Sequence, residues 1–188
     1  MGVSSFDMAL VVLLRGVNVG GHRRFRPSVL AEELRKYDVV SMGATGTFVV
    51  RRPGATAEFR AELVRRLPQN ATLAICGGRE FLDWAVQNPF RAAPTAHDVV
   101  RFVSVLVKAA PARPSLPINI PSEGEWLVRV IGVTGRFVFG EYRRHMRTIG
   151  CLGQIDKIFG VKATTRSWTT MMKIAEILKT QSRPGNLI

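Results

Sequence analysis

The spacing of apolar and polar residues predicts alternating strands and helices in the first part of the chain. A continuous apolar run from Met8 to Leu14 is typical of a strand buried on both faces. Apolar residues then recur at helical spacing over 27–37, where Pro27 suits the first helical position, and over 57–67, where Thr56 is the expected cap. Short strands are expected at Val39–Met42, Phe48–Arg51 and Thr72–Ile75.

The predicted order is therefore β-α-β-β-α-β, the ferredoxin-like arrangement, in which two helices pack on one face of an antiparallel sheet. We predict an α+β protein whose residues 1–77 form this ferredoxin-like half. Residues 78–98 are expected to provide a linking helix, ended by Asn88-Pro89, and a loop. Residues 99–188 are expected to form a second, smaller α+β half that packs against the first and ends in an amphipathic helix.

The pattern in the second half is less regular. A long strand is expected at Val99–Val107, and four prolines within 109–121 exclude a central strand there. Strands at 126–131 and 136–139 are expected to form a hairpin around Gly132–Gly135. Helices are expected at about 151–159 and 167–179, with a bend at Gly160. The last helix carries an apolar stripe of Trp168, Met171, Met172, Ala175 and Leu178.

Composition narrows the class of protein. Of the 188 residues, 46% are hydrophobic and 22% are charged, which is typical of a soluble globular protein. The net charge of +13 favours a polyanionic partner such as nucleic acid. Arginines outnumber lysines 21 to 6, however, and an arginine-rich composition also arises from codon bias in a GC-rich genome. Charge alone leaves these two explanations open.

Several classes of site and location are not indicated. The apolar run at Met8–Leu14 is too short for a bilayer span and lacks the basic flank of a signal peptide, so a cytoplasmic protein with no membrane partner is expected. Cys76 and Cys151 are far apart, and the three histidines show no metal-ligand spacing. We expect no metal and no cofactor, and no recognisable catalytic motif is present.

The segment Leu13–Gly21, LLRGVNVGG, is the first candidate site. Gly16 and Gly21 have the spacing of a nucleotide-binding P-loop, but His22 and Arg23 stand where that motif needs Lys and Ser or Thr. The segment is then either a strand-to-helix turn with solvated arginines or an anion-binding loop before a helix N-terminus. The ligand-binding candidates in it are Arg15, Asn18, Gly20, Gly21 and Arg23.

Two further segments are candidate ligand-binding regions. Residues 141–147 place Tyr142 among three arginines that include Arg144, a combination that suits single-stranded nucleic acid or a phosphorylated ligand, or simply a solvated loop. Arg166 and Trp168 lie at the expected start of the last helix, where Thr165 or Ser167 would be the cap. A cation there opposes the helix dipole, so a nearby anion is expected.

Three segments together, ALVVLLRGVNVGG, NPF and TTRSWTTMMKIAEIL, resemble the bacterial domain of unknown function 1697 (DUF1697) family. The resemblance extends from about Ala9 to Leu178 and implies an α+β protein with ferredoxin-like character, but it implies no reaction. The positions that match the family motifs are Arg15, Gly16, Asn18, Gly20, Gly21, Asn88, Pro89, Phe90, Arg166 and Trp168.

This sequence departs from the family pattern at three places. Ala44-Thr45-Gly46-Thr47 stands where the family has Gln-Ser-Gly-Asn, Ser167 stands for Asn, and His22 stands for a Lys that often follows the paired glycines. If those amides bind a ligand in the family, this chain binds it differently or not at all.

Two functions remain open. The first is an anion-binding module, with nucleic acid as the partner; residues 136–173 hold eight Lys or Arg against two acids. Its strands lack the paired exposed aromatics of an RNA-recognition sheet. The second is an enzyme or binder for a phosphorylated or carboxylated small molecule, held between the halves by Arg15, Asn18 and Arg166. The sequence does not indicate an oligomeric state.

Overall fold

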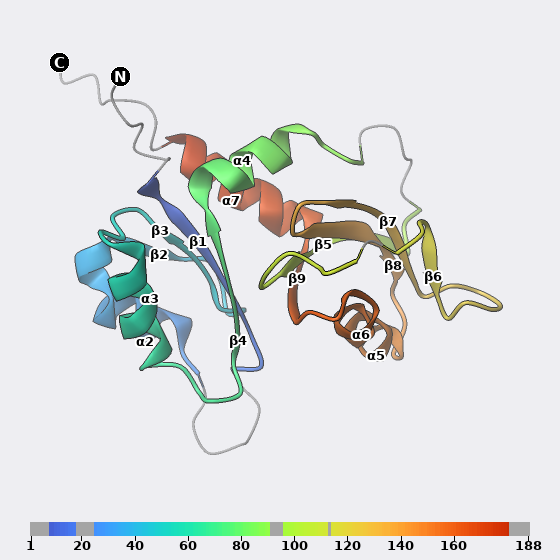
Figure 1. Cartoon of the computed structure of the whole chain (residues 1–188), viewed down its shortest axis with the longest axis horizontal. Helices are drawn as coiled ribbons and strands as arrows, with labels where there is room; N and C mark the ends of the chain where they lie inside the picture. Colours follow the sequence, from blue (N-terminus) through green and yellow to red (C-terminus); the bar gives the residue numbers. More distant parts are fainter. Residues whose placement is uncertain (1–7, 18–24, 91–95, 113, 181–188) are drawn as a thin grey trace. The chain divides into compact units, whose positions relative to one another are not determined.

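The computed structural model describes residues 8–17, 25–90, 96–112 and 114–180, which form an α+β fold with two antiparallel sheets (Figure 1). The chain divides into two units. The first unit runs to Asp83 and also includes the chain from Lys173, whereas the second runs from Trp84 to Met172.

The first unit has the ferredoxin-like order predicted from the sequence. Its sheet has the strand order β2-β3-β1-β4, with antiparallel neighbours throughout. β3 therefore lies between β1 and β2, and β1 lies between β3 and β4, as the ferredoxin-like topology requires. The elements are β1 (Leu10–Arg15), α2 (Pro27–Glu33), η1, a 3-10 turn (Arg35–Tyr37), β2 (Val39–Ser41), β3 (Thr47–Val50), α3 (Thr56–Val64) and β4 (Thr72–Gly77).

The core of this unit explains the continuous apolar run at its start. On one face of β1, Leu10, Val12 and Leu14 belong to a buried cluster that includes residues of both helices, such as Leu30 and Phe59. On the other face of β1, Val11 and Leu13 are buried as well. The prediction of a strand buried on both faces is confirmed. Burial of one such side chain stabilises the fold by about 1.5–3 kcal/mol.

Two local predictions in the first unit were wrong. The helix expected over 27–37 ends at Glu33 and continues as the 3-10 turn η1, after which Asp38 takes a left-handed conformation with φ of 53°. Thr56 was expected to cap the second helix, but it is the first helical residue. Ala55 stands at the cap, where no side chain can accept a hydrogen bond from the first turn.

The second unit holds a five-stranded antiparallel sheet with the order β6-β7-β8-β5-β9. Its core lies on one face, where Phe102, Val128 and Val138 of the sheet cluster with Ile155 and Phe159. The elements are β5 (Val99–Leu106), β6 (Ile118–Ile120), β7 (Val128–Thr134), β8 (Phe137–Arg143), α5 (Thr148–Gly153), α6 (Ile155–Phe159) and β9 (Ala163–Ser167). The short strand β6 lies at a sheet edge, as the flanking prolines require.

Two helices cross the boundary between the units. The first is α4 (Gly78–Val86), which crosses it at Asp83, and the second is α7 (Trp168–Thr180), which crosses it at Met172. Among the helices of the described ranges, none has both the length and the hydropathy that a bilayer span needs.

The structure corrects three predictions for the second unit. β9 (Ala163–Ser167) was not predicted, because only a bend at Gly160 and the last helix from Ser167 were expected there. The helix expected over 151–159 is two short helices, α5 and α6. The hairpin turn lies at Gly135, with φ of 58°, whereas Gly132 lies inside β7 at an irregularity in the pairing. A Cβ atom at Gly132 would lie 2.1 Å from Cζ of Phe139, so this glycine allows the ring to pack.

Candidate functional site

The loop predicted as an anion site is only partly described. Arg15 is the last residue of β1, opposite Thr72 of β4, and Gly16 begins the turn with φ of 76°. Asn18, Gly20, Gly21 and Arg23 lie outside the described residues. Their role therefore stays a prediction.

A surface pocket of about 180 Å³ lies on the first unit. Its lining includes Phe25 and Arg26, the first residues described after position 24, and the buried Leu30 of α2. On its rim, Arg66 forms an ion pair of 3.5 Å with Glu33.

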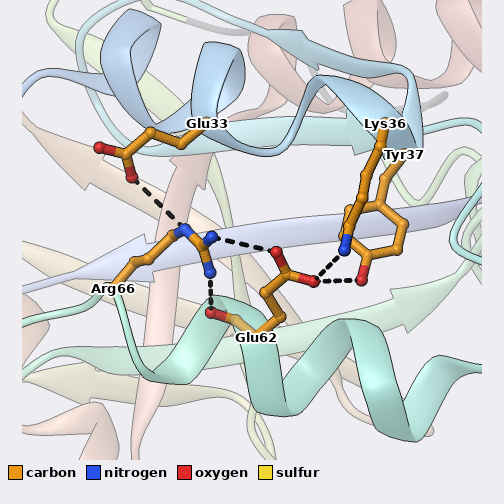
Figure 2. Close-up of polar contacts among 5 residues, drawn as sticks. All are labelled: Glu33, Lys36, Tyr37, Glu62 and Arg66. Carbon is orange, nitrogen blue, oxygen red and sulfur yellow. Dashed lines mark hydrogen bonds and ion pairs between the residues drawn. The ribbon is translucent and has the colours of Figure 1, made fainter.

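Arg66 also belongs to a polar network between the segment around η1 and α3 (Figure 2). The Glu62 carboxylate accepts a hydrogen bond of 2.5 Å from the Tyr37 hydroxyl, lies 2.7 Å from Lys36 Nζ and 3.0 Å from Arg66 Nη2. Hydrogen bonds from Lys36 and then Tyr37 lower the pKa of Glu62 to about 2, and the same contact with Glu62 raises the pKa of Lys36.

This network balances its own charge, because two carboxylates face two cations. Arg66 is held by Glu33 and Glu62, so an anion in the pocket would have to compete with two carboxylates. The network ties helix α3 to the end of the α2 segment, and we assign it a structural role.

The face of the second sheet opposite its core carries a row of polar residues. In the strand register, Asn119 of β6 lies opposite Arg129 of β7, which lies opposite Glu141 of β8, which lies opposite Arg101 of β5. Arg129 Nε donates a hydrogen bond of 2.9 Å to Asn119 Oδ1, and Arg101 Nε lies 3.7 Å from Glu141 Oε1. Four strands thus bring two arginines, one carboxylate and one amide side by side.

At the end of this row, Trp126 contacts two guanidinium groups. The Cζ atoms of Arg129 and Arg143 lie 4.6 and 4.8 Å from the centre of the Trp126 ring, within the range of cation–π attraction. We call these three residues the Trp126 stack. Arg143 also pairs with Glu125 and lies 4.0 Å from Asp98, so the stack is held from two further segments.

The same face continues into an aromatic cluster. Phe90 lies edge to face with Phe139 and Trp168, at centroid separations of 6.1 and 5.1 Å. Trp84 stacks on Phe137 at 4.6 Å and meets Trp168 edge to face. Arg101 joins this cluster to the polar row, because its Cζ lies 5.2 Å from the centre of the Phe90 ring.

Arg166 lies just before the last helix, as predicted, but within β9, a strand that was not predicted. It is opposite Val103 of β5, one residue before the cap of α7. Ser167 provides the cap, because its Oγ accepts a hydrogen bond from the Thr170 amide, so this part of the prediction is confirmed. Burial lowers the pKa of Arg166 to about 10, which leaves it protonated at neutral pH. Its guanidinium donates to the Thr165 carbonyl.

The structure brings some of the predicted site residues together. By strand alternation, Arg166 shares a sheet face with Arg101 and Arg129, and Trp168 packs in the aromatic cluster of that face. Arg144 is exposed just after β8, where its amide donates to the Asp98 carbonyl.

Sequence reasoning missed Trp126, Arg129 and Arg101 as functional candidates. The only local signal was the Trp-x-x-Arg spacing of Trp126 and Arg129, because Arg143 reaches them through the β7–β8 pairing. Among the residues that the structure describes, no group of three His, Cys, Asp or Glu could hold a metal ion.

Comparisons with known proteins give a family and a fold. Residues 8–119, more than half of the chain, match the family described as protein of unknown function (DUF1697). Among solved structures, the chain is similar to the conserved bacterial protein SP0830 from Streptococcus pneumoniae, with a TM-score of 0.57 and 15% identity over 90% of this chain and 98% of that one. No curated protein matches. At that identity the likeness shows the fold alone.

Proposed function

Since this chain belongs to the DUF1697 family, whose description assigns no activity, we propose its function from its own residues: a cytoplasmic module that binds single-stranded nucleic acid through the Trp126 stack. The observation that carries this proposal is the contact of one tryptophan with the guanidinium groups of Arg129 and Arg143.

The chemistry of the stack suits a single strand. Bases stack on aromatic rings and on guanidinium planes, and every base has such a face, so binding of this kind tolerates many sequences. The same guanidinium groups can bind the phosphates between bases. Arg144 and Arg147 are exposed beyond the end of β8 and extend the positive charge from Arg143.

The surrounding carboxylates set the strength of binding. Glu125 and Asp98 pair with Arg143, and Glu141 lies in the row beside Arg129. A phosphate must compete with these carboxylates, so we expect moderate affinity that depends strongly on ionic strength. A fully paired duplex offers no free base faces to the stack, so a ligand with single-stranded bases is expected to bind better.

The test is fluorescence anisotropy of a labelled oligonucleotide of about 16 nucleotides with the full chain, in DNA and RNA forms, over a range of salt concentrations. We expect Trp126→Ala to weaken binding about tenfold or more, since base stacking is worth about 1–3 kcal/mol per base. Arg129→Gln with Arg143→Gln should weaken binding and reduce its dependence on salt.

The matched control replaces Arg60 and Arg65 with Gln, because both are exposed on the first unit and the change in net charge is the same. If both double variants lose the same affinity for the oligonucleotide, binding depends only on the net charge of the chain and not on the Trp126 stack. Absence of binding at low salt would refute the proposal. Binding of inorganic phosphate or a nucleoside monophosphate at the stack, without binding of the oligonucleotide, would favour a small-molecule ligand.

A further inference from the structure

The segment after β8 exposes two large apolar side chains. Met146 is 95% exposed and Ile149 is 82% exposed, the highest values among the large hydrophobic residues that the structure describes. They are three residues apart, and Arg144 and Arg147 flank Met146. We call residues 144–149 the Met146 tip.

Hydrogen bonds fix the backbone of the Met146 tip. The Thr148 hydroxyl donates to the Arg143 carbonyl at 2.6 Å, and the Thr148 amide donates to the His145 carbonyl. The Arg147 amide donates to His145 Nδ1 at 3.1 Å. Because the turn is held in this way, Met146 and Ile149 stay in water as a property of the fold.

Within the segment 142–155 the charged side chains are all basic, whereas the carboxylates of Glu125 and Asp98 lie beside Arg143 at the base of the tip. No Asp or Glu occurs from Tyr142 to Ile155, whereas Arg143, Arg144 and Arg147 lie in that range. The exposed apolar side chains lie next to the exposed Arg144 and Arg147, and such a surface complements a partner that has both an anionic and an apolar part. Nucleic acid has both, as phosphates and base faces.

The tip is also continuous with the Trp126 stack. Arg143 contacts the Trp126 ring, and its carbonyl accepts the hydrogen bond from Thr148 at the base of the tip. A strand that binds the stack therefore passes near the tip. A lipid surface would use the tip alone and would leave the neighbouring stack without a role, so the continuity favours nucleic acid.

We infer that Met146 and Ile149 act as an apolar wedge against bases at the point where a single strand leaves a duplex, so that the preferred partner is a nucleic acid with such a junction. This inference rests on the proposed binding at the Trp126 stack. Apolar side chains that enter a base step unstack it partly, and this costs least at the end of a duplex, where one neighbour is already absent.

The experiment compares a forked DNA duplex with the single strand of its arm, using the full chain. A 2-aminopurine at the fork reports unstacking by an increase in fluorescence. We expect the fork to bind about tenfold more tightly than the single strand, since the two side chains bury apolar area only at the junction. Met146→Ser with Ile149→Ser should remove the preference and the fluorescence increase, and should change single-strand affinity by no more than about twofold.

The matched control is Val64→Ser with Val86→Ser, two valines that are 50% and 67% exposed on other helices. This control should keep both the preference for the fork and the fluorescence increase. If the chain binds the fork and the single strand with equal affinity, the wedge is refuted. The proposed function remains, because the single strand still binds at the Trp126 stack. If Trp126→Ala abolishes binding while the tip variant keeps the full preference for the fork, that result also refutes only the wedge.

Two other results would overturn the inference. If the wild-type chain binds no oligonucleotide at all, both the proposed function and the wedge fail. If the tip variant loses binding to vesicles that contain phosphatidylserine while its binding to the fork is unchanged, the tip contacts anionic lipid instead of bases.

Discussion

Phe90 and Trp168 meet edge to face inside the second unit, with ring centroids 5.1 Å apart and ring planes at 71°. Phe90 ends the Asn-Pro-Phe segment, and Trp168 follows Arg166-Ser167. The two segments, far apart in the sequence, thus join in one aromatic cluster that also contacts Arg101. Phe90 and Trp168 therefore have a packing role that is visible without any ligand.

Truncation of Phe90 should therefore be costly. Phe90 is 2% exposed and touches Phe139, Trp168 and Arg101, so Phe90→Ala should lower the free energy of unfolding by about 3–5 kcal/mol. Urea unfolding followed by tryptophan fluorescence measures this change. Val86→Ala, at an exposed position shortly before it, should change stability by less than about 0.5 kcal/mol. If Phe90→Ala and Val86→Ala unfold at similar urea concentrations, the aromatic cluster contributes little to stability.

Gly140 should not tolerate a side chain. A Cβ atom there would lie 2.1 Å from the Arg129 carbonyl oxygen, which is fixed backbone in the neighbouring strand. Gly140→Ala should therefore disrupt the β7–β8 pairing, and the variant should unfold at a much lower urea concentration or fail to fold. Gly150→Ala is the matched control, because nothing lies within 4 Å of its Cβ position in α5. That control should be neutral or stabilising by up to about 1 kcal/mol.

The polar network of Glu62 with Lys36, Tyr37 and Arg66 should make the free energy of unfolding depend on pH below about 4.5. The pKa of Glu62 in the folded chain is about 2, below its ordinary value of 4.5. Its contribution is therefore present above pH 4.5 and is lost as the pH falls through about 2, because the unfolded chain takes up the proton first. Urea unfolding at several pH values measures this dependence.

Glu62→Gln should remove this part of the pH dependence and should be less stable than the wild type at neutral pH. Tyr37→Phe should raise the pKa of Glu62, since one of its hydrogen-bond donors is lost. Glu32→Gln is a suitable control, because Glu32 pairs with Arg35 at the exposed surface. If the stability of Glu62→Gln depends on pH in the same way as that of the wild type, the pH dependence does not arise from Glu62.

The salt dependence of nucleic-acid binding should show how many arginines of the Met146 tip contact phosphates. Arg144→Gln and Arg147→Gln should each reduce the slope of log affinity against log salt by about 0.7, if each arginine neutralises one phosphate of a single strand. Arg60→Gln should leave the slope unchanged. Anisotropy titrations over a range of salt concentrations provide the measurement, and identical slopes in all variants would show that the tip makes no phosphate contact.

Nucleic acid should also accompany the chain during purification. Without a high-salt wash, we expect a ratio of absorbance at 260 and 280 nm above that of the protein alone, and a fall of the ratio after such a wash. The Trp126→Ala variant should carry less nucleic acid than the wild type. A protein-like ratio before any wash would count against the proposed function and would favour the small-molecule alternative.

Strong local patterns made most of the fold predictable. The apolar run before Arg15 and the helical spacing around Leu30 and Phe59 reflect burial in one core, so the ferredoxin-like order could be predicted. The strand β9 could not, because Thr164, Thr165 and Arg166 do not alternate between apolar and polar. Pairing with β5 makes this segment a strand, and that partner is distant in sequence.

The candidate site was less predictable for a related reason. Its residues come from β5, β7 and β8, and only the sheet register places Arg101, Glu141 and Arg129 in one row. Gly132 and Gly135 are equally plausible turn residues in sequence, and the packing of Phe139 decides between them. Asn18, Gly20, Gly21 and Arg23 lie outside the described residues and stay predictions.

The division of the chain has a consequence for its synthesis. The second unit is one continuous segment from Trp84 to Met172, whereas the first unit also needs α7 from Lys173, including the buried Ile174 and Leu178. On a ribosome, the second unit is therefore complete in sequence before the first, although its residues come later than β1. The first unit lacks its last segment until α7 has been synthesised, and the continuous second unit can fold during that interval.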